Sequence, residues 1–451
     1  MSSRIGNPHI LVIPYPAQGH MIPLMELSKY LAKHGFRITF ISTQQNNELI
    51  MKSFTSQDNK IGVVSIDSSE KGYNSSGEIM RVMPGKVEQV IEEINASNSD
   101  KISCIIADQS IGWALELAER KGIPRAAFCP AAAAQLLLGF SIPKLIQDGI
   151  IDQNGTPKKD QIVKLSPTMP AMKASNLVWA CLGNIEAQKN IFQLMLRNNK
   201  SIKLTDWLLC NSAYDLEPAA FNLSPHHILP IGPISSINTQ TTNPSEDQDL
   251  SCLKWLDQQP PKSVIYVAFG SSTVLDPNQF QELALGLELS NKPFLWVVRS
   301  DITTGSTSFN AFLEEFKKRV ENVGKIVGWV PQKKVLDHPC VACFISHCGW
   351  NSIIEGVSNG VPFLCWPYFA DQFMNGSYIC DVWRNGLGFD RDENGVIVRG
   401  EIKNKVEMLL SDGDVKNRAL YFKEIVRNCV KEGGSSCQNL EKFVNWLTSL
   451  V

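Results

Sequence analysis

Residues 329–372 read WVPQKKVLDHPCVACFISHCGWNSIIEGVSNGVPFLCWPYFADQ. An apolar run at Val341–Ser346 leads into a glycine-containing turn that begins at His347, and a helical pattern follows at Ile353–Val357. Short apolar runs that end in a turn before a helix are typical of buried strands in parallel sheets. A second apolar run, Val361–Trp366, comes after the helix. The stretch therefore predicts a strand, a helix and a second strand of a doubly wound sheet.

The start of the predicted helix suits an anionic ligand. Asn351 and Ser352 open the helix, where backbone N–H groups and hydroxyls point away from the helix. His347 lies on the same turn and could donate to a phosphate oxygen. These three residues indicate a diphosphate site.

Polar and aromatic residues on either side suit a nucleoside and a sugar. Trp329 offers a flat face for a base, and Glu355, one helical turn after the helix start, could accept from ribose hydroxyls. Asp371 and Gln372 follow the second apolar run, at the carboxyl edge where ligands of doubly wound folds bind. Together these residues predict a nucleotide-sugar pocket.

The spacing of this stretch resembles the signature box of plant-type UDP-dependent glycosyltransferases (family 1, GT-B fold), with Trp first, HCGWNS in the middle, Glu in the helix and DQ last. The resemblance implies that Trp329 stacks on uracil and that Val330 contacts it through its backbone. It also implies that Trp350, Asp371 and Gln372 contact the sugar. The full set of donor-binding residues that it implies is Ser271, Trp329, Val330, Gln332, His347, Trp350, Asn351, Ser352, Glu355, Asp371 and Gln372.

Length and composition limit the class of protein. A chain of 451 residues is too long for one core and suits two domains of about 200 residues each. The net charge of −2 gives no field for nucleic acid or for an anionic membrane, so a small-molecule partner is favoured. The 12 cysteines, in a sequence without a recognisable secretory signal, are expected to be reduced thiols.

The sequence shows no candidate membrane span. The most apolar window, Ala126–Ile142, is interrupted by proline, glutamine and glycine and falls short of the length a bilayer requires. The amino-terminal segment lacks the basic flank and apolar core of a signal peptide. We expect a cytoplasmic protein that is a monomer.

The amino-terminal half alternates strands with helical patterns, which predicts a parallel doubly wound sheet. Residues 150–205 contain turn clusters, and we expect them to be irregular and to shape the acceptor side. The predicted strands are His9–Pro14, Arg37–Ile41, Ile61–Ile66, Ile102–Ala107, Arg125–Phe128 and Trp207–Asn211, and the helices are 22–34, 45–55, 84–97, 111–121 and 131–148.

Two polar residues lie at the carboxyl ends of strands of this half. His20 follows the first strand and Asp108 ends the strand at Ile102–Ala107, so both should face one crevice. His20 could serve as a general base that Asp108 orients and stabilises. Position alone favours another interpretation, an exposed histidine at a helix start and an aspartate that caps the helix near Ile111. The resemblance reverses this preference, because PAQGH and the later aspartate match the positions of the family's catalytic pair.

The carboxy-terminal half repeats the same alternation of strands and helical patterns. It follows a polar segment, Ser235–Asp249, which is the best linker candidate. We expect an acceptor-binding domain at 1–234, a linker at 235–250 and a UDP-sugar-binding domain at 251–432. The GT-B fold implies that a final helix in 433–451 packs back on the first domain. Expected elements are strands at Val264–Phe269, Phe294–Val298 and Ile326–Val327, and helices at 251–258, 277–289, 373–384, 401–411, 413–431 and 436–449.

Two patterns suggest metal sites. Residues 390–401 match the calcium-loop expression, but Gly386 and Gly388 would break an entering helix and no second copy exists, so a turn between strand and helix is favoured. His338, Cys340, Cys343, His347 and Cys348 are dense enough for zinc, yet side chains that alternate across a strand cannot converge on one ion.

Two further patterns suggest other enzymes. Gly356-Val-Ser358-Asn-Gly360 matches the sequence pattern of a nucleophile elbow. However, the order of helix and strand around Ser358 is reversed, so a helix end at Gly360 is favoured. Neither half shows Gly-x-Gly-x-x-Gly after its first strand, which weakens the alternative of a nicotinamide oxidoreductase.

The sequence and the resemblance together predict an inverting glycosyltransferase. His20 would remove the acceptor proton, and His347 with the helix start at Asn351 would neutralise charge on the departing diphosphate without a metal or other cofactor. Gln372 at the end of the stretch resembles glucose users. The expected acceptor is a small plant metabolite, such as a flavonoid, terpenoid or other phenol. Carbon-linked transfer to a phenol ring and a sugar-nucleotide-binding protein without turnover remain as alternatives.

Overall fold

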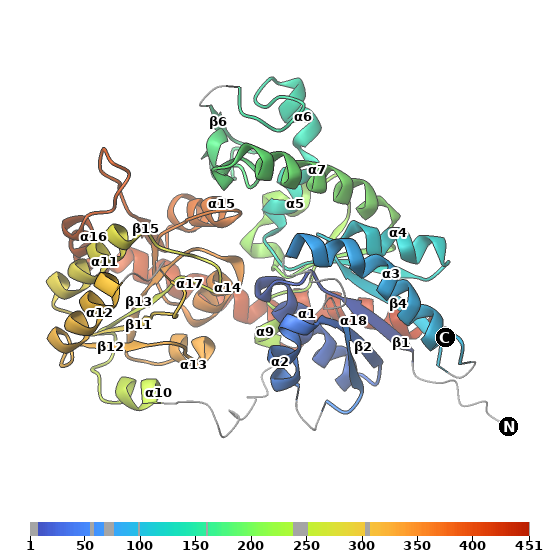
Figure 1. The fold of residues 1–451 in the computed structure, drawn as a ribbon, viewed down its shortest axis with the longest axis horizontal. Coiled ribbons are helices and arrows are strands. Elements are labelled where there is room, and N and C mark those ends of the chain that lie inside the picture. Colours follow the sequence, from blue (N-terminus) through green and yellow to red (C-terminus); the bar gives the residue numbers. More distant parts are fainter. Residues whose placement is uncertain are drawn as a thin grey trace. The chain divides into compact units, whose positions relative to one another are not determined.

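The computed structural model describes residues 8–54, 58–66, 76–97, 100–158, 161–237, 251–302 and 307–450 (Figure 1). The chain divides into two compact units. The first unit comprises Met1–Lys158, Gly183–Thr241 and Asn428–Val451, and the second comprises Lys159–Leu182 and Thr242–Arg427. The chain thus passes from one unit to the other more than once.

The first unit is built on a parallel sheet whose described strands are arranged in the order β3-β2-β1-β4-β5-β8-β9. The order reverses between β1 and β4, as in a doubly wound fold. Every residue of β1 is buried, because helices cover both faces of such a sheet. The strands are β1 His9–Ile13, β2 Arg37–Thr43, β3 Ile61–Ile66, β4 Ile102–Asp108, β5 Arg125–Cys129, β8 Trp207–Cys210 and β9 Ile228–Pro230.

Helices alternate with these strands, and the last helix of the chain joins them. Leu440, Phe443 and Leu447 of α18 are fully buried in the same core as Leu24 of α1. The Ser436 hydroxyl also donates to the carbonyl of Gly232 at 2.7 Å. The helices of this unit are α1 Gln18–Lys33, α2 Gln44–Ser53, α3 Ser76–Asn95, α4 Gly112–Arg120, α5 Ala133–Phe140, α6 Ile142–Gln147, α7 Ile185–Ser201, α8 Pro218–Leu223, α9 Ile234–Ile237 and α18 Ser435–Thr448.

The structure contradicts the expectation that residues 150–205 are irregular, since α7 occupies Ile185–Ser201. Asn184 caps this helix by accepting from the backbone N–H groups of Glu186 at 2.8 Å and Ala187 at 3.2 Å. Phe192 is buried, whereas Ile185 is 71% exposed. The turn clusters before the helix obscured its start in the sequence.

The segment 159–182 groups with the second unit, whereas the sequence placed it in the first domain. It contains the short hairpin of β6 (Ile162–Val163) and β7 (Met172–Lys173), and Trp179 within it is fully buried. Its Cys181 thiol accepts a hydrogen bond from the backbone N–H of Ala370 at 3.2 Å. This segment is therefore an insertion that contributes to the second unit.

The second unit has a parallel sheet in the order β12-β11-β10-β13-β14-β15, which reverses between β10 and β13. Its core includes Val267, Trp296 and Ile345 from three neighbouring strands. The strands are β10 Val264–Ala268, β11 Phe294–Val297, β12 Gly324–Val327, β13 Val341–Ser346, β14 Phe363–Cys365 and β15 Gly386–Gly388. The helices are α10 Ser251–Leu256, α11 Pro277–Ser290, α12 Thr307–Arg319, α13 Gln332–Leu336, α14 Trp350–Asn359, α15 Gln372–Ser377, α16 Arg399–Ser411 and α17 Gly413–Val430.

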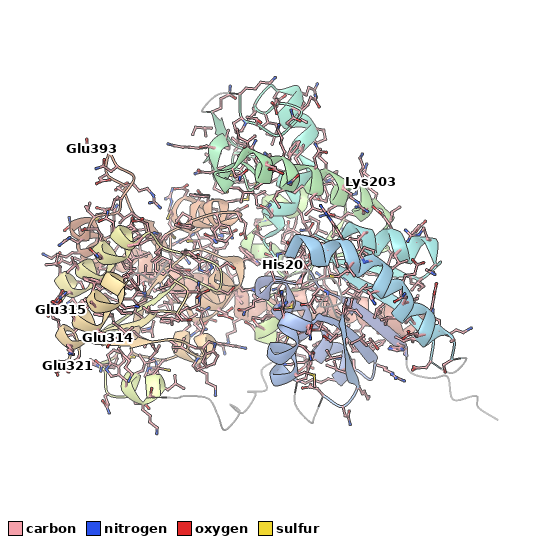
Figure 2. The ribbon with its side chains drawn as sticks, viewed as in Figure 1. His20, Lys203, Glu314, Glu315, Glu321 and Glu393 are labelled. Atoms are coloured by element: carbon pink, nitrogen blue, oxygen red, sulfur yellow. The ribbon has the colours of Figure 1, made fainter. Side chains whose placement is uncertain are left out.

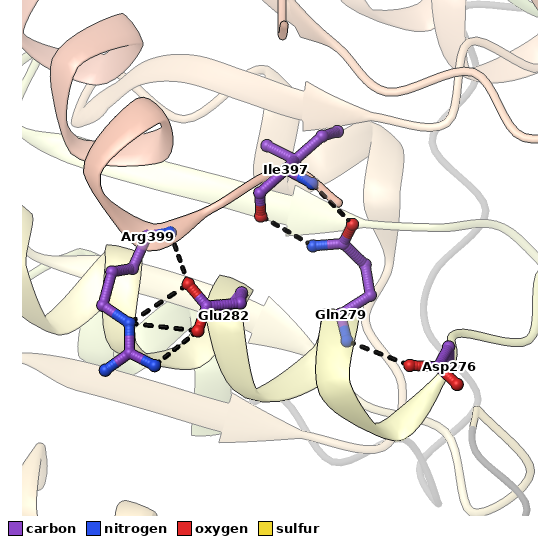
Figure 3. A network of polar contacts seen from close by, with 5 residues as sticks. All are labelled: Asp276, Gln279, Glu282, Ile397 and Arg399. Carbon is purple, nitrogen blue, oxygen red and sulfur yellow. Dashed lines mark hydrogen bonds and ion pairs between the residues drawn. The ribbon is translucent and has the colours of Figure 1, made fainter. Parts of the chain in front are cut away.

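Within residues 390–401, residues 390–398 form a turn between β15 and α16 and residues 399–401 begin α16, in agreement with the turn that the sequence favoured. Gln279 of α11 binds both backbone groups of Ile397, at 2.8 and 2.9 Å, and Glu282 accepts from the backbone of Arg399 at 2.6 Å (Figure 3). Asp390 and Glu401, two of the supposed calcium ligands, both pair with Lys405. These contacts hold the turn in place.

The predicted strands and helices differ from the structure mainly at their ends. The predicted helix 373–384 divides into α15 and a π-helical turn, Tyr378–Trp383. Gly360 ends α14 with a φ of +67°, as expected from the order of elements around Ser358. Most of the predicted linker, residues 238–250, lies outside the described residues. Among the residues the structure describes, none forms a helix long and apolar enough to span a membrane.

Candidate active site

His20 and Asp108 are in direct contact in the first unit. His20 lies in the first turn of α1, labelled in Figure 2, and Asp108 is the last residue of β4. Because β1 and β4 are neighbours where the strand order reverses, their carboxyl ends bring the two residues together. The Nδ1 atom of His20 lies 2.8 Å from Oδ2 of Asp108. The sequence prediction that they share one crevice is consistent with this geometry.

The surroundings of this pair fix its orientation. Asp108 is fully buried, and its Oδ1 accepts from the backbone N–H of Ser110 at 2.8 Å. The His20 side chain keeps 31% of its surface exposed. The ring of Tyr15 lies 5.0 Å from the imidazole ring, and burial together with the Asp108 charge raises the pKa of Tyr15. The result is an accessible imidazole held by a buried carboxylate.

A second polar region lies at the corresponding point of the other sheet, where β10 and β13 are neighbours. Ser271 is exposed on the turn that follows β10, and His347 directly follows β13. A Cβ atom at Gly270 would lie 2.6 Å from Nε2 of His347, and one at Gly349 would lie 2.4 Å from it. Glycine at both positions therefore keeps this edge of the imidazole clear of side-chain atoms.

The charge state of His347 differs from the expectation that it neutralises a diphosphate. Burial, and then the nearby Arg299 guanidinium, lower the pKa of His347 to about 4, against the smaller opposing effect of the Ala268 carbonyl. Near pH 7 the imidazole is therefore neutral. It can donate a hydrogen bond to a phosphate oxygen, but it brings no positive charge.

A hydrogen-bond network links the residues expected at the diphosphate and ribose. The Gln332 amide donates to the Ser352 hydroxyl at 3.0 Å and to Oε2 of Glu355 at 2.8 Å. The buried Tyr266 hydroxyl donates to Oε1 of Gln332 at 2.9 Å. Gln332 therefore orients the carboxylate of Glu355, while the Ser352 side chain is largely buried. Tyr266 was missed in the sequence because it lies within an apolar strand.

The residues expected to hold the base differ in exposure. Trp329 is 56% exposed just after β12, whereas Val330 is buried. A broad indole face at the carboxyl end of a strand is available for stacking. Asn351, in the first turn of α14, is partly exposed at the positive end of the helix dipole.

The side chains of the three residues expected at the sugar contact mainly other groups of the protein. Trp350 is only 4% exposed, and its ring lies 6.3 Å from that of Trp383. Gln372 is equally buried, and its Oε1 accepts from the backbone N–H groups of two preceding residues at 2.8 and 3.0 Å. Asp371 is partly exposed and accepts from Asn375 at 2.8 Å. Among these three, Asp371 presents the most accessible side chain.

No metal site is visible among the residues that the structure describes, because no group of three His, Cys, Asp or Glu side chains is arranged to hold an ion. A cavity of about 350 Å³ lies elsewhere in the first unit, between α3, α4 and α7. The residues that line it include none of the predicted site residues; they are Met80, Arg81, Pro84, Trp113, Glu116, Leu117, Arg120 and Arg197.

Two doubly wound parallel sheets, each with polar residues where its strand order reverses, together with the match to solved plant glycosyltransferase structures, assign the chain to the GT-B class of fold. The profile of the family described as UDP-glucoronosyl and UDP-glucosyl transferase matches residues 10–428. UDP-glycosyltransferase 83A1 of Arabidopsis thaliana is 50% identical, with 100% of this chain and 99% of the relative covered. Linamarin synthase 1 of Manihot esculenta is 31% identical, with 97% and 96% covered. The chain therefore belongs to this family and is a plant-type UDP-glycosyltransferase.

Solved structures agree with this assignment. Phytolacca americana UGT2, in complex with UDP-2fluoro-glucose and pterostilbene, matches 98% of this chain and 100% of that chain with a TM-score of 0.83 at 25% identity. A UDP-glucosyltransferase from Polygonum tinctorium capable of glucosylating indoxyl matches 99% and 100% with a TM-score of 0.83 at 25% identity. The fold and the family thus support an enzyme that acts on a UDP-sugar and a small metabolite.

Proposed function

We propose that this protein transfers glucose from UDP-glucose to a hydroxyl group of a small plant metabolite, with inversion at the anomeric carbon. His20 removes the hydroxyl proton as the acceptor oxygen bonds to the anomeric carbon. The bond from that carbon to the β-phosphate oxygen breaks, and its electron pair leaves with UDP. One displacement by this route inverts the anomeric centre.

The contact between His20 and Asp108 is the observation that carries the proposal. Since Nδ1 of His20 lies 2.8 Å from the Asp108 carboxylate, Nε2 is the ring atom that would receive the proton. The carboxylate then stabilises the imidazolium that forms. A buried aspartate that a backbone N–H also holds would keep its position through the reaction.

The donor would be held by the second unit. Trp329 offers its exposed face to uracil, Glu355 would accept from ribose, and the start of α14 with Ser271 and the neutral His347 would donate to the diphosphate. Asp371 would bind a sugar hydroxyl. In this proposal protein donors and the helix dipole stabilise departing UDP, so turnover requires no metal ion.

The acceptor class rests on the relatives. The Polygonum enzyme glucosylates indoxyl, and the Phytolacca structure holds pterostilbene, so a phenolic or other small hydroxylated acceptor is the first to test.

The test incubates the protein with UDP-glucose, EDTA and a mixed library of phenols, terpenoids and flavonoids, with mass detection of products. We expect one or more monoglucosides and release of UDP. Acid hydrolysis separates two outcomes, because an oxygen-linked glucoside releases its sugar and a carbon-linked one does not. UDP binding without any product, across the library and other UDP-sugars, would contradict the proposal and favour a non-catalytic sugar-nucleotide-binding protein.

A further inference from the structure

Arg299 is a charged residue of the second unit that was not among the site residues predicted from the sequence. It lies just after β11, at the same carboxyl edge as the turn after β10. Its side chain is only 19% exposed, which is low for arginine. A guanidinium in such a place is expected to be held by several acceptors.

The guanidinium of Arg299 binds the turn at both ends. One terminal nitrogen donates to the carbonyl of Gly270, and the other donates to the carbonyl of Thr273 at 2.9 Å. Its Nε donates to Asp301 at 2.9 Å, which lowers the pKa of that exposed carboxyl group. Arg299 thus closes the 270–273 turn into one rigid piece, as the planar fork of an arginine allows and a lysine does not.

The turn that Arg299 holds faces His347. Gly270 has a φ of +67°, a conformation that suits glycine, and the position that a Cβ atom would occupy lies toward Nε2 of the imidazole. Ser271, the next residue, is exposed. Displacing Gly270 would therefore change both the position of the Ser271 hydroxyl and the space beside the His347 ring.

We propose that Arg299 is a positioning residue of the donor site, which holds the 270–273 turn against His347 and so shapes the surface that receives the diphosphate. The proposal rests on the donor site described under the proposed function. Arg299 also contributes to the low pKa of His347 after burial, while the Ala268 carbonyl acts in the opposite direction. The same guanidinium would thus set both the shape and the charge of this surface.

The test measures UDP affinity by calorimetry for wild type, Arg299→Met and Arg299→Lys. We expect Arg299→Met to bind UDP about tenfold more weakly, because two carbonyls of the turn lose a charged donor. Arg299→Lys keeps the charge but cannot bind both carbonyls in the same way, so its affinity should lie between the two. Arg319→Met is the matched control, since Arg319 binds Glu288 of α11 and Glu315 of its own helix, α12, and neither belongs to the 270–273 turn.

A pH series separates positioning from a general loss of structure. Without Arg299 the pKa of His347 should rise above about 4, while burial, the larger cause of the shift, still holds it below the ordinary value of about 6.5. The imidazole would then become charged at mildly acidic pH, and the Arg299→Met variant should gain UDP affinity relative to wild type as the pH falls from 7.5 to 5. Wild type corrects for protonation of UDP itself, and an Arg299→Met/His347→Asn double variant should not show the gain.

The outcomes are distinguishable. Wild-type UDP affinity of the Arg299→Met variant at pH 7.5 would overturn the inference, whatever its pH profile, while leaving the proposed function intact. If wild type binds no UDP, the donor site fails and the inference fails with it. If Arg299→Met does not fold, Arg299→Lys decides, because an unchanged affinity there would show that the two-carbonyl contact is not needed.

Discussion

The two polar regions each have a histidine where the strand order of a parallel sheet reverses, yet the two histidines have opposite neighbours. In the first unit His20 contacts the carboxylate of Asp108, and in the second His347 lies near the guanidinium of Arg299. A carboxylate stabilises an imidazolium, whereas burial beside a cation disfavours it. The fold therefore supplies the location, and burial together with the sign of the neighbouring charge decides whether the ring is suited to accept a proton or to donate a neutral hydrogen bond.

The first prediction tests the role of His20 by removing the imidazole that contacts a carboxylate. His20→Ala should lower turnover by about 10²-fold or more, the usual scale of general-base catalysis, with UDP affinity almost unchanged. Steady-state kinetics and UDP calorimetry measure the two quantities. His34→Ala, an exposed histidine at the other end of α1, is the control. Full activity of His20→Ala would exclude His20 as the base.

A substitution at the donor site of the second unit should weaken UDP binding and leave turnover almost unchanged. Trp329→Ala removes the exposed indole and should weaken UDP binding by about 1–3 kcal/mol, the usual range for stacking of a base on an aromatic side chain. Turnover at saturating UDP-glucose should change little, since the indole does not contact the reacting atoms. Tyr421→Ala, which removes an aromatic side chain of similar exposure from the same unit, is the control. An unaltered UDP constant for Trp329→Ala would contradict the stacking role.

The third prediction concerns the charge of His347 and tests the electrostatic difference between the two histidines. Its pKa is lowered to about 4 in the folded protein, so between about pH 6.5 and 4 the unfolded chain binds a proton that the folded chain does not. The lowered pKa of His347 therefore does not affect the free energy of unfolding above about pH 6.5. It reduces that free energy as the pH falls from about 6.5 to about 4.

The His347→Asn variant lacks this contribution. Its unfolding free energy relative to wild type should therefore rise by on the order of 2 kcal/mol on going from pH 7.5 to 4.5, with an allowance for partial exposure of the ring. Thermal unfolding of both proteins across this range measures the change, and the difference at pH 7.5 is the internal reference. A constant difference would show that His347 is not held neutral.

The continuous apolar runs of both sheets made the strands predictable, because a parallel sheet is buried on both faces. The run Val341–Ser346 matches β13 in full. The helix at Ile185–Ser201 was not predicted, since its exposed first residue and polar surface hide the apolar period that Phe192 completes. Burial of a single helical side chain depends on neighbours that are distant in the sequence.

At the site, the spacing of residues in the sequence predicted which residues belong to it. The spacing did not predict how exposed their side chains are. Trp350 and Gln372 occupy the positions that the resemblance implied, yet their side chains are buried among other protein groups. Arg299 follows a strand just as Asp108 ends one, but an arginine after a strand is usually exposed, so its position carried no signal. Its contacts with Gly270 and Thr273 depend on how adjacent strands align.

The passage of the chain between units has a consequence for anyone who recombines relatives of this enzyme. A hybrid made with one junction between residues 238 and 250 would pair the insertion 159–182 of one parent with the 367–371 loop of the other, where the Cys181 thiol meets Ala370. It would also bring α18 from the wrong parent, with Leu440, Phe443 and Leu447 entering a foreign core. Donor specificity should therefore be transplanted with several crossovers, which carry 159–182 along with 242–427 and leave the last helix with its own parent.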